Sequence, residues 1–257
     1  MNITHKNRNS PPQRVRRGFT LVETVIAMGI ITVMITAFLA AFGPAVQGIR
    51  RSISAKEANR LASTLEYELS ILRAGDEAAD YSTSFEKAYE WIKDSGGTEH
   101  DHIVLIYQYR GDPSSSRDDG TYEPQTDRNK QIPGTDYVLQ SVVRRLGDSK
   151  VSEELKPGVV EGRVFYVRMN QLIFENGELV LTGDTGSIID PTEPRDATTT
   201  YEDYPEAVIT YQAQIYVLRS SIYAYVDKTF NLTDTNGDGH PDVTGKPIFT
   251  RNMAVRR

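Results

Sequence analysis

Apolar residues are concentrated in one long run near the start of the chain, from Phe19 to Ile49, and Glu23 is its only ionisable residue. Roughly 20 apolar helical residues span a hydrocarbon core of about 30 Å, so this run is long enough to cross a bilayer. Five basic residues precede the run and should hold the first segment in the cytoplasm: Lys6, Arg8, Arg14, Arg16 and Arg17. The pattern predicts a leader at residues 1–18 and a transmembrane helix at residues 19–49.

The helical pattern continues beyond the apolar run, because residues 50–74 are polar but keep apolar positions at helical spacing. These positions form one stripe: Ile49, Ile53, Leu61, Leu65, Leu69 and Leu72. We expect the stripe to pack against a globular domain rather than to form a groove for a partner. Gly75 is expected to end the helix as a C-cap. Pro44 is expected to kink or locally melt it, because proline removes a backbone hydrogen bond.

The remainder, residues 75–257, predicts a soluble domain that contains both helix and sheet. One short helix is expected at residues 84–93, where apolar residues share one side. Strands are expected where Val, Ile, Tyr and Thr dominate between turn-forming clusters, namely at residues 102–109, 137–145, 163–174, 207–218, 221–226 and 247–250. A long helix followed by a helix and antiparallel strands is an α+β order.

Two kinds of connection are expected between these strands. Asn176-Gly177 is a strong hairpin signal and predicts that Leu172–Phe174 pairs with Leu179–Leu181. Residues 111–134 and 183–205 are long and polar, and we expect them to be mobile loops.

A short motif surrounds the start of the apolar run. Its sequence, Gly18-Phe19-Thr20-Leu21-Val22-Glu23, follows the basic leader and places a carboxylate five residues into the span. An isolated carboxylate in hydrocarbon costs roughly 2.5–3.5 kcal/mol or more and usually marks a partner or a function. The leader, the motif and the span together closely resemble the prepilin recognition site of type IV pilins and type II secretion pseudopilins, over residues 14–50.

This resemblance implies a processing pathway. In that family a membrane-embedded aspartyl peptidase cuts after the glycine and N-methylates the new terminus. Cleavage here would fall between Gly18 and Phe19, Phe19 would become the methylated terminus, and Glu23 would be the glutamate used in filament assembly. The implied fold is pilin-like α+β, with a long N-terminal helix whose first half spans the membrane and a mainly antiparallel β domain after it. The implied partners are other pilin or pseudopilin subunits, the prepilin peptidase and an inner-membrane assembly platform.

Two simpler interpretations of the apolar run compete with this one. An ordinary secretory signal has a short apolar core followed by a small-x-small cleavage site. The nearest candidate, Ala41-Phe42-Gly43, would leave Pro44 directly after the cut, which is unfavourable. A plain single-pass anchor fits the length of the run but leaves Glu23 without a purpose.

Charge and cysteine content narrow the range of functions. The 257-residue chain has a formal charge of −6; removing residues 1–18 takes away five of its 29 basic residues and none of its 35 acidic ones, which leaves −11. This composition is not that of a nucleic-acid-binding protein. The chain has no cysteine, so no disulfide can close the exported domain. Packing, a metal ion or neighbouring subunits must stabilise it instead.

A calcium site is predicted near the C-terminus, in the segment Asp234-Thr-Asn-Gly-Asp-Gly-His-Pro-Asp242. Calcium takes six to eight oxygen ligands, and this spacing can wrap side chains and one backbone carbonyl around an ion. The candidate ligands are Asp234, Asn236, Asp238, the backbone carbonyl of His240, and Asp242. The segment resembles the first nine positions of an EF-hand or dockerin-type loop. However, Gly245 stands at position twelve, where a bidentate acid should be, and the alternative is an acidic turn between strands.

Other polar clusters give weaker signals. His100-Asp101-His102 is interpreted as a surface turn, because neighbouring strand residues point to opposite faces and a third metal ligand is missing. Three carboxylate pairs are interpreted as solvated charge without a companion base or nucleophile: Asp118-Asp119, Glu153-Glu154 and Glu202-Asp203. Strand tyrosines are expected to pair within the sheet rather than to stack on sugars or bases. The chain has no phosphate loop, Gly-x-Ser-x-Gly motif or zinc spacing, so we expect no enzymatic activity.

Two functions from different classes remain. The first is a minor pilin or pseudopilin of a type IV pilus-like or type II secretion filament, held in the bacterial inner membrane by a single pass with its C-terminal domain in the periplasm. The second is an adhesin-like or substrate-recognition module displayed at the cell surface, for which the pilin helix is only the attachment. In that case residues 111–134 and 183–205 would be the contact loops. The sequence leaves open whether the machine is a pilus, a secretion system or a DNA-uptake apparatus.

Overall fold

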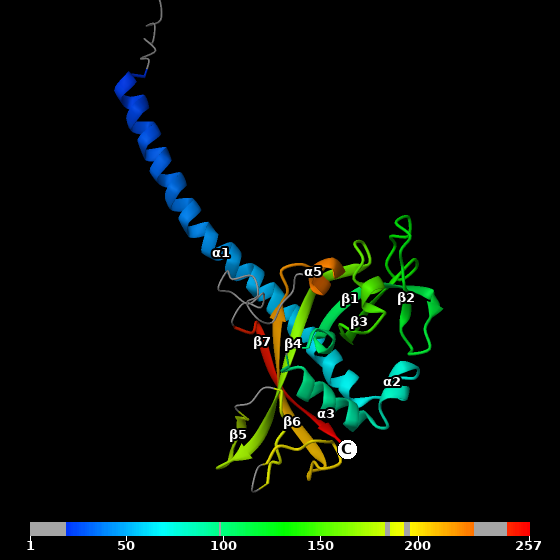
Figure 1. The fold of residues 1–257 in the computed structure, drawn as a ribbon. Coiled ribbons are helices and arrows are strands. Elements are labelled where there is room, and N and C mark those ends of the chain that lie inside the picture. Colours follow the sequence, from blue (N-terminus) through cyan, green and yellow to red (C-terminus); the bar gives the residue numbers. More distant parts are fainter. Residues whose placement is uncertain (1–18, 98, 183–185, 193–195, 229–245) are drawn as a thin grey trace, which may run out of the picture. The chain divides into compact units, whose positions relative to one another are not determined.

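A computed structural model describes residues 19–97, 99–182, 186–192, 196–228 and 246–257. The chain divides into two compact units, residues 1–50 and residues 51–257. Helix α1 (Leu21–Ser70) runs through the first unit and ends in the second, which also contains a seven-stranded sheet and several short helices (Figure 1). This is the pilin-like α+β layout that the sequence predicts.

The first unit is the apolar part of α1. Every residue from Leu21 to Arg50 is exposed, although this is the most apolar stretch of the chain. The helix continues without a break through Pro44. The expected local melting at Pro44 is therefore wrong for this structure; a single proline removes one hydrogen bond, and the helical residues on both sides keep theirs.

The second part of α1 buries one face against the domain. Leu61, Leu65 and Leu69 are at most 1% exposed, as the stripe predicts. The start of the stripe is wrong, because Ile49 and Ile53 are 61% and 59% exposed. The buried residues at the start of this face are small ones: Ser54, Ala58 and Ala62.

The strands form one antiparallel sheet in which β1 and β4 are the central members. Strand β1 pairs with β2, β3 and β4; β4 also pairs with β5 and β6, and β6 pairs with β7. The strands are β1 (Val104–Ser116), β2 (Tyr122–Pro124), β3 (Val138–Arg145), β4 (Val160–Glu175), β5 (Glu178–Leu181), β6 (Val208–Val217) and β7 (Phe249–Arg256).

Alternate residues of the strands build two separate hydrophobic cores, one on each face of the sheet. In β1, Val104 and Ile106 belong to the core that contains α1 and α3 (Ser84–Asp94). Leu105 and Tyr107 belong to the opposite core, which α4 (Val151–Glu154) and α5 (Tyr223–Lys228) help to form. The sheet is therefore covered on both faces in this region.

The helix predicted at residues 84–93 is confirmed as α3, which Thr83 caps by accepting a hydrogen bond from the backbone of Glu86. The end predicted for the long helix is wrong. Helix α1 stops at Ser70, and Gly75, with φ 87°, instead precedes α2 (Asp76–Asp80). Lys87 donates to the backbone carbonyl of Ile71 (3.1 Å). This side chain supplies the hydrogen bond that an amide of a further helical turn would otherwise donate.

The predicted hairpin is confirmed. Asn176 and Gly177 have φ values of 51° and 90°, and the register places Phe174 opposite Leu179. Positive φ at both central residues is what a tight hairpin turn requires, and glycine and asparagine reach it most easily.

Two strand assignments and one loop assignment need correction. Residues 221–226 are not a strand; most of them form α5, where Val226 is fully buried and its amide donates to Ile222 four residues earlier (3.3 Å). The segment was assigned to a strand because it is apolar, but a short apolar run can equally form a buried helix. The loop expected at 111–134 begins as an extension of β1 and includes β2. The last strand, expected at 247–250, is the longer β7.

Candidate functional site

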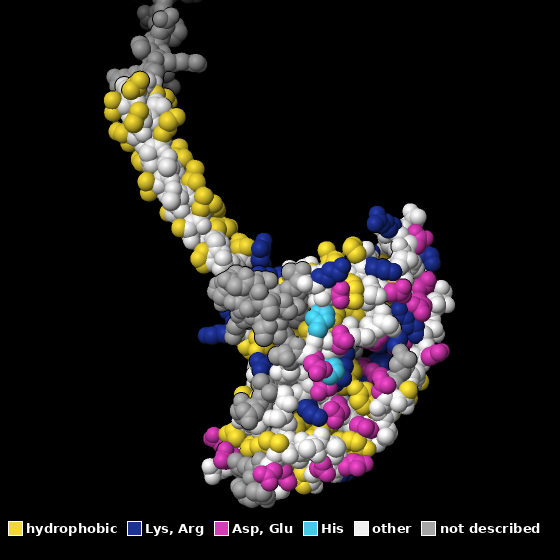
Figure 2. Space-filling view, in the orientation of Figure 1, with side chains coloured by type: hydrophobic (Ala, Val, Ile, Leu, Met, Phe, Trp, Pro, Cys, Tyr) yellow, Lys and Arg dark blue, Asp and Glu magenta, His cyan; other side chains and the backbone are white. Residues whose placement is uncertain are grey.

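The first candidate site is the start of α1. Among the described residues, α1 is the helix that is long and apolar enough to cross a membrane. Figure 2 shows its hydrophobic side chains in yellow along the whole first part. Gly18 lies outside the described residues, and Phe19 is 89% exposed.

Thr20 and Glu23 form a capping box at the first turn of this helix. The backbone amide and the hydroxyl of Thr20 both donate to Oε2 of Glu23, at 2.9 and 3.0 Å. The backbone amide of Glu23 donates in return to the Thr20 hydroxyl (3.2 Å). Such a box satisfies amides that the helix leaves without a partner. The carboxylate at the anomalous position therefore has a local role in starting the helix.

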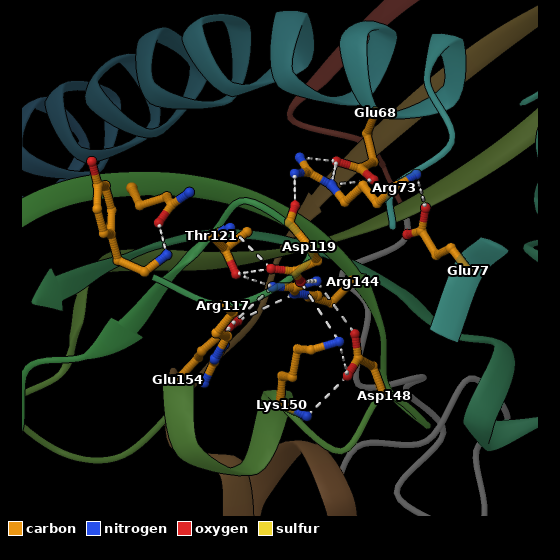
Figure 3. A network of polar contacts seen from close by, with 12 residues as sticks. Glu68, Arg73, Glu77, Arg117, Asp119, Thr121, Arg144, Asp148, Lys150 and Glu154 are labelled. Carbon is orange, nitrogen blue, oxygen red and sulfur yellow. Dashed lines mark hydrogen bonds and ion pairs between the residues drawn. The ribbon is translucent and has the colours of Figure 1, made fainter. Parts of the chain in front are cut away.

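The second candidate site is a group of charged side chains in the second unit, which we call the ionic network (Figure 3). It consists of Glu68, Arg73, Glu77, Lys87, Arg117, Asp119, Arg144 and Glu154. These residues come from α1, α2, α3, β3, α4 and the connections between them. The network therefore joins segments that are far apart in the sequence.

One half of the ionic network surrounds the end of α1. The side chains of Glu68 and Lys87 are 1% and 0% exposed, and Lys87 Nζ lies 2.9 Å from Oε1 of Glu68 and 2.7 Å from Oε2 of Glu77. Arg73 also binds Glu68, at 2.7 Å. Burial alone would raise the pKa of Glu68, but hydrogen bonds from Arg73 and the charge of Lys87 outweigh it and lower that pKa.

The other half surrounds Glu154, whose side chain is fully buried. Arg144 Nη2 lies 3.2 Å from Glu154 Oε1, Arg117 binds the same oxygen, and the Tyr107 hydroxyl donates to Oε2 (2.7 Å). Burial and then the charge of Glu154 raise the pKa of Tyr107 well above its usual value. The tyrosine therefore keeps its proton and donates this hydrogen bond.

Asp119 links the two halves. Its carboxylate lies 3.0 Å from Arg144 Nη1, and its backbone carbonyl accepts a hydrogen bond from Arg73 (2.9 Å). Burial would raise the pKa of Asp119, but hydrogen bonds from Thr121 and the charge of Arg144 lower it instead.

The interpretation of two carboxylate pairs as solvated charge is thus wrong for one member of each pair. Asp119 and Glu154 are buried and bonded to arginines, whereas Asp118 and Glu153 remain outside the core. Sequence reasoning missed the ionic network because its partners are 5 to 46 residues apart and share no local motif. Glu202-Asp203 agrees with the prediction, since both residues are exposed.

A cavity of about 430 Å³ lies beside the ionic network, and Arg73, Glu77, Asp119 and Arg144 form part of its wall. Figure 2 shows acidic and basic side chains close together on this side of the second unit, near the histidines in cyan. The rest of the wall includes Trp91, the only tryptophan of the chain.

His100–His102 form a single 3-10 turn before β1, and the interpretation of this segment as a turn is confirmed. No group of three metal-ligating side chains occurs in the described part of the chain. Tyr166 and Tyr216 lie opposite each other in β4 and β6 and stack with ring centroids 5.8 Å apart. The interpretation of strand tyrosines as sheet pairs is confirmed for this pair.

The five calcium ligands proposed from the sequence cannot be placed in this site. Asp234, Asn236, Asp238, His240 and Asp242 lie outside the described residues. The calcium site therefore stays a prediction.

Comparison with known proteins adds information on the start of the chain. A family model described as the prokaryotic N-terminal methylation motif matches residues 13–39. The chain is type IV pilin-like at its N-terminus. No curated protein and no solved structure matches the chain. The motif and the apolar helix together fit a membrane-anchored protein of a structural class that in general assembles with other pilin subunits.

Proposed function

We propose that this protein is a minor pilin or pseudopilin, processed by a prepilin peptidase and assembled into a type IV pilus-like or type II secretion filament. The observation that carries the proposal is the methylation motif at residues 13–39, which leads directly into a fully exposed apolar helix. A helix that is apolar on every side needs either lipid or other subunits around it. The apolar helix of a filament subunit is surrounded by lipid while it is in the membrane, and by the helices of other subunits after assembly.

Before processing, the N-terminus lies in the cytoplasm, α1 crosses the inner membrane once, and residues 51–257 lie in the periplasm. The five basic residues of the leader support this orientation. The partners of the protein are then the prepilin peptidase, the inner-membrane assembly platform and other pilin or pseudopilin subunits. The large domain and its long polar connections favour a low-abundance position over one in a densely repeated shaft.

The proposal requires cleavage after Gly18, because a side chain at this position would obstruct the close approach of the backbone to the peptidase. Gly18→Val should leave the full-length precursor in the inner membrane, whereas the wild-type chain should begin with N-methylated Phe19. Mass spectrometry of the protein from its natural host measures both outcomes.

Gly29→Val is the matched control. It introduces the same side chain eleven residues further along α1, where nothing lies within 4 Å of an added Cβ atom, so normal cleavage is expected. A mature N-terminus other than Phe19 in the wild type, or normal cleavage of Gly18→Val, would contradict the proposal. Neighbouring genes for an assembly ATPase, a prepilin peptidase and a secretin would favour a machine component over a specialised display protein.

A further inference from the structure

Strands β5 and β7 form opposite edges at one end of the sheet, where the strands follow in the order β5-β4-β6-β7 (Figure 1). Leu172 of β4 pairs with Leu181 of β5 on one side and with Thr210 of β6 on the other, and Thr210 pairs with Ala254 of β7. In the described part of the chain, β5 pairs only with β4, and β7 pairs only with β6. Each of these edge strands therefore has one side without a neighbouring strand.

Strand β7 points alternate backbone groups away from the sheet. The amide of Arg257 donates to the carbonyl of Ala207 (2.8 Å), and inward and outward positions alternate along an antiparallel pair. The residues of β7 whose amides and carbonyls point outward are therefore Thr250, Asn252, Ala254 and Arg256. Strand β7 has eight residues, pairs with β6 without a register shift and contains no proline. A regular edge of this kind is a template for a further strand.

Strand β5 exposes both backbone groups and apolar side chains. The amide of Thr182 donates to the carbonyl of Gln171 (3.1 Å), so the backbone groups of Leu179 and Leu181 point outward by the same alternation. The side chains of these two leucines are exposed and share one face of the sheet with the exposed Phe174. Figure 2 shows hydrophobic and acidic side chains next to each other where Figure 1 places β5. Exposed apolar residues beside an open strand edge indicate a contact surface for another chain.

The two edges carry opposite charges. Residues 246–257 contain four basic residues and no acidic residue, and Glu66 neutralises one of them by pairing with Arg251 (3.0 Å). Residues 172–182, which form the hairpin of β4 and β5, contain two acidic residues and no basic residue. Pairing two β7 edges, or two β5 edges, would bring like charges together, which is destabilising. Charge therefore favours a contact between β5 of one molecule and β7 of another.

We propose that copies of this chain associate head to tail, with the outer edge of β5 in one copy pairing with the outer edge of β7 in the next. The outward amides and carbonyls of the two strands then bond to each other, and the sheet continues from copy to copy. Each contact uses two different surfaces, so every assembly keeps one free β5 edge and one free β7 edge for further copies. The interface lies within residues 51–257 and does not require cleavage after Gly18. In a filament, it would place copies of this subunit next to one another.

Disulfide cross-linking can test this pairing, because the chain has no cysteine of its own. Leu181→Cys is combined in turn with Thr250→Cys, Asn252→Cys and Ala254→Cys, which samples three registers between the two edges. Within one copy, residues 181 and 254 are three strand spacings apart, or about 14 Å. A disulfide requires Cα atoms within about 7 Å, so any disulfide formed must join two copies.

The full chain is oxidised in detergent micelles that greatly outnumber it, so that few micelles hold two copies by chance. At least one double variant should form a ladder of dimers, trimers and longer species on a non-reducing gel. The four single-cysteine variants are the controls and should remain monomeric, because a cross-link between them would need two like edges to meet. All four positions are exposed or at the edge of the sheet, and the three β7 positions are alternatives, so a folding defect in one still leaves two.

A pair of charge variants tests the complementarity of the edges. In the double variant that cross-links most, Glu178→Lys should lower the initial rate of cross-linking about threefold, because it places a positive charge against the basic edge. Asp118→Lys makes the same change in net charge at an exposed position between β1 and β2, and it should leave the rate unchanged. A higher NaCl concentration should also slow cross-linking, since salt screens surface charges.

Three results would overturn the proposal: no ladder from any of the three double variants, dimers of a single-cysteine variant at the level of the double variants, or equal rates for Glu178→Lys and Asp118→Lys. The second result would mean that two like edges meet, and the third that charge does not select the edges. None of these results bears on processing, which the cleavage of Gly18→Val tests separately.

Discussion

Carboxylates occur in the apolar helix of the first unit and in the interior of the second unit, and their hydrogen-bonding needs are met in different ways. Glu23 in the first unit has one partner residue, Thr20, three positions away in the same helical turn. Glu68 and Glu154 in the second unit each have at least two cationic partners from other segments. The first arrangement is local and uses neutral donors, whereas the second is long-range and pairs full charges.

The difference indicates which charged residues stabilise the fold and which remain available to interact with other molecules. A capping box offsets only the hydrogen-bonding needs of a helix start, so the charge of Glu23 is not neutralised within the described chain. The ionic network neutralises its own charges and joins α1 to the sheet region. We therefore expect substitutions in the network to change stability, and substitution of Glu23 to change assembly.

The largest expected effect is that of Lys87→Met. Lys87 is fully buried and binds two carboxylates and the carbonyl of Ile71. Its removal leaves Glu77 without its cationic partner and the buried Glu68 with Arg73 alone. Breaking one partner of a buried ion pair costs about 3–5 kcal/mol. Urea unfolding of the full chain in detergent, followed by Trp91 fluorescence, measures the loss.

Lys93→Met is the matched control for this prediction. Lys93 also lies on α3, but its side chain is 31% exposed; its ion pair with Glu90 spans 3.4 Å, and its contact with the carbonyl of Thr199 spans 3.5 Å. Exposed pairs contribute at most about 1 kcal/mol, so the control should unfold almost like the wild type. Equal losses for the two variants would show that the ionic network does not hold the domain together.

The same contrast explains what could be predicted from the sequence. The motif around Gly18, the apolar span and the Asn176-Gly177 hairpin depend on residues close together in the chain, and the local pattern was sufficient for them. The ionic network was not predictable, because Glu154 meets Arg117 and Tyr107 only after β1, β3 and α4 have packed. A tertiary contact also determines the end of α1. Lys87 donates a hydrogen bond to the carbonyl of Ile71, whereas the sequence pattern predicts that the helix continues past this residue.

The next prediction concerns carboxylates that would be neutralised by a cation from solution, rather than by a capping box or by the ionic network. Calcium bound by Asp234, Asn236, Asp238, His240 and Asp242 would stabilise the folded chain by about 2.7 kcal/mol at a hundredfold excess over Kd. Magnesium should do less, because it requires a tighter octahedron and gives up water reluctantly. The melting temperature of the full chain, measured in detergent after chelation and again after adding each ion, tests this.

Single substitutions should separate ligands from neighbours in this segment. Asp234→Ala and Asp238→Ala should each abolish the increment from calcium, whereas Thr235→Ala, whose side chain is not a proposed ligand, should retain it. An unchanged melting curve of the wild type at millimolar calcium would mean that the segment is only an acidic turn. Gly245, in the place of the twelfth ligand, would then be the reason.

The smallest free-energy change is expected at Glu23, where loss of a helix cap costs about 1 kcal/mol. We propose that its charge pairs with the methylated amine of Phe19, on the same or an adjacent subunit, because two opposite charges in hydrocarbon cost less than one alone. Glu23→Ala removes both the cap and the charge. Glu23→Gln removes only the charge, since glutamine can also close a capping box with Thr20. Both variants should be cleaved and inserted, and both should be incorporated less than the wild type when the filament is purified.

Thr20→Val is the complementary control, because it removes the hydroxyl that bonds to Glu23 but leaves the carboxylate charged. It should be incorporated better than Glu23→Gln if the charge drives assembly. The reverse order, with Glu23→Gln in the filament at the wild-type level and Thr20→Val depleted, would assign Glu23 to the helix start alone. Glu23 would then serve only the fold of its own chain, as the acids of the ionic network do, and the difference between the two units would disappear.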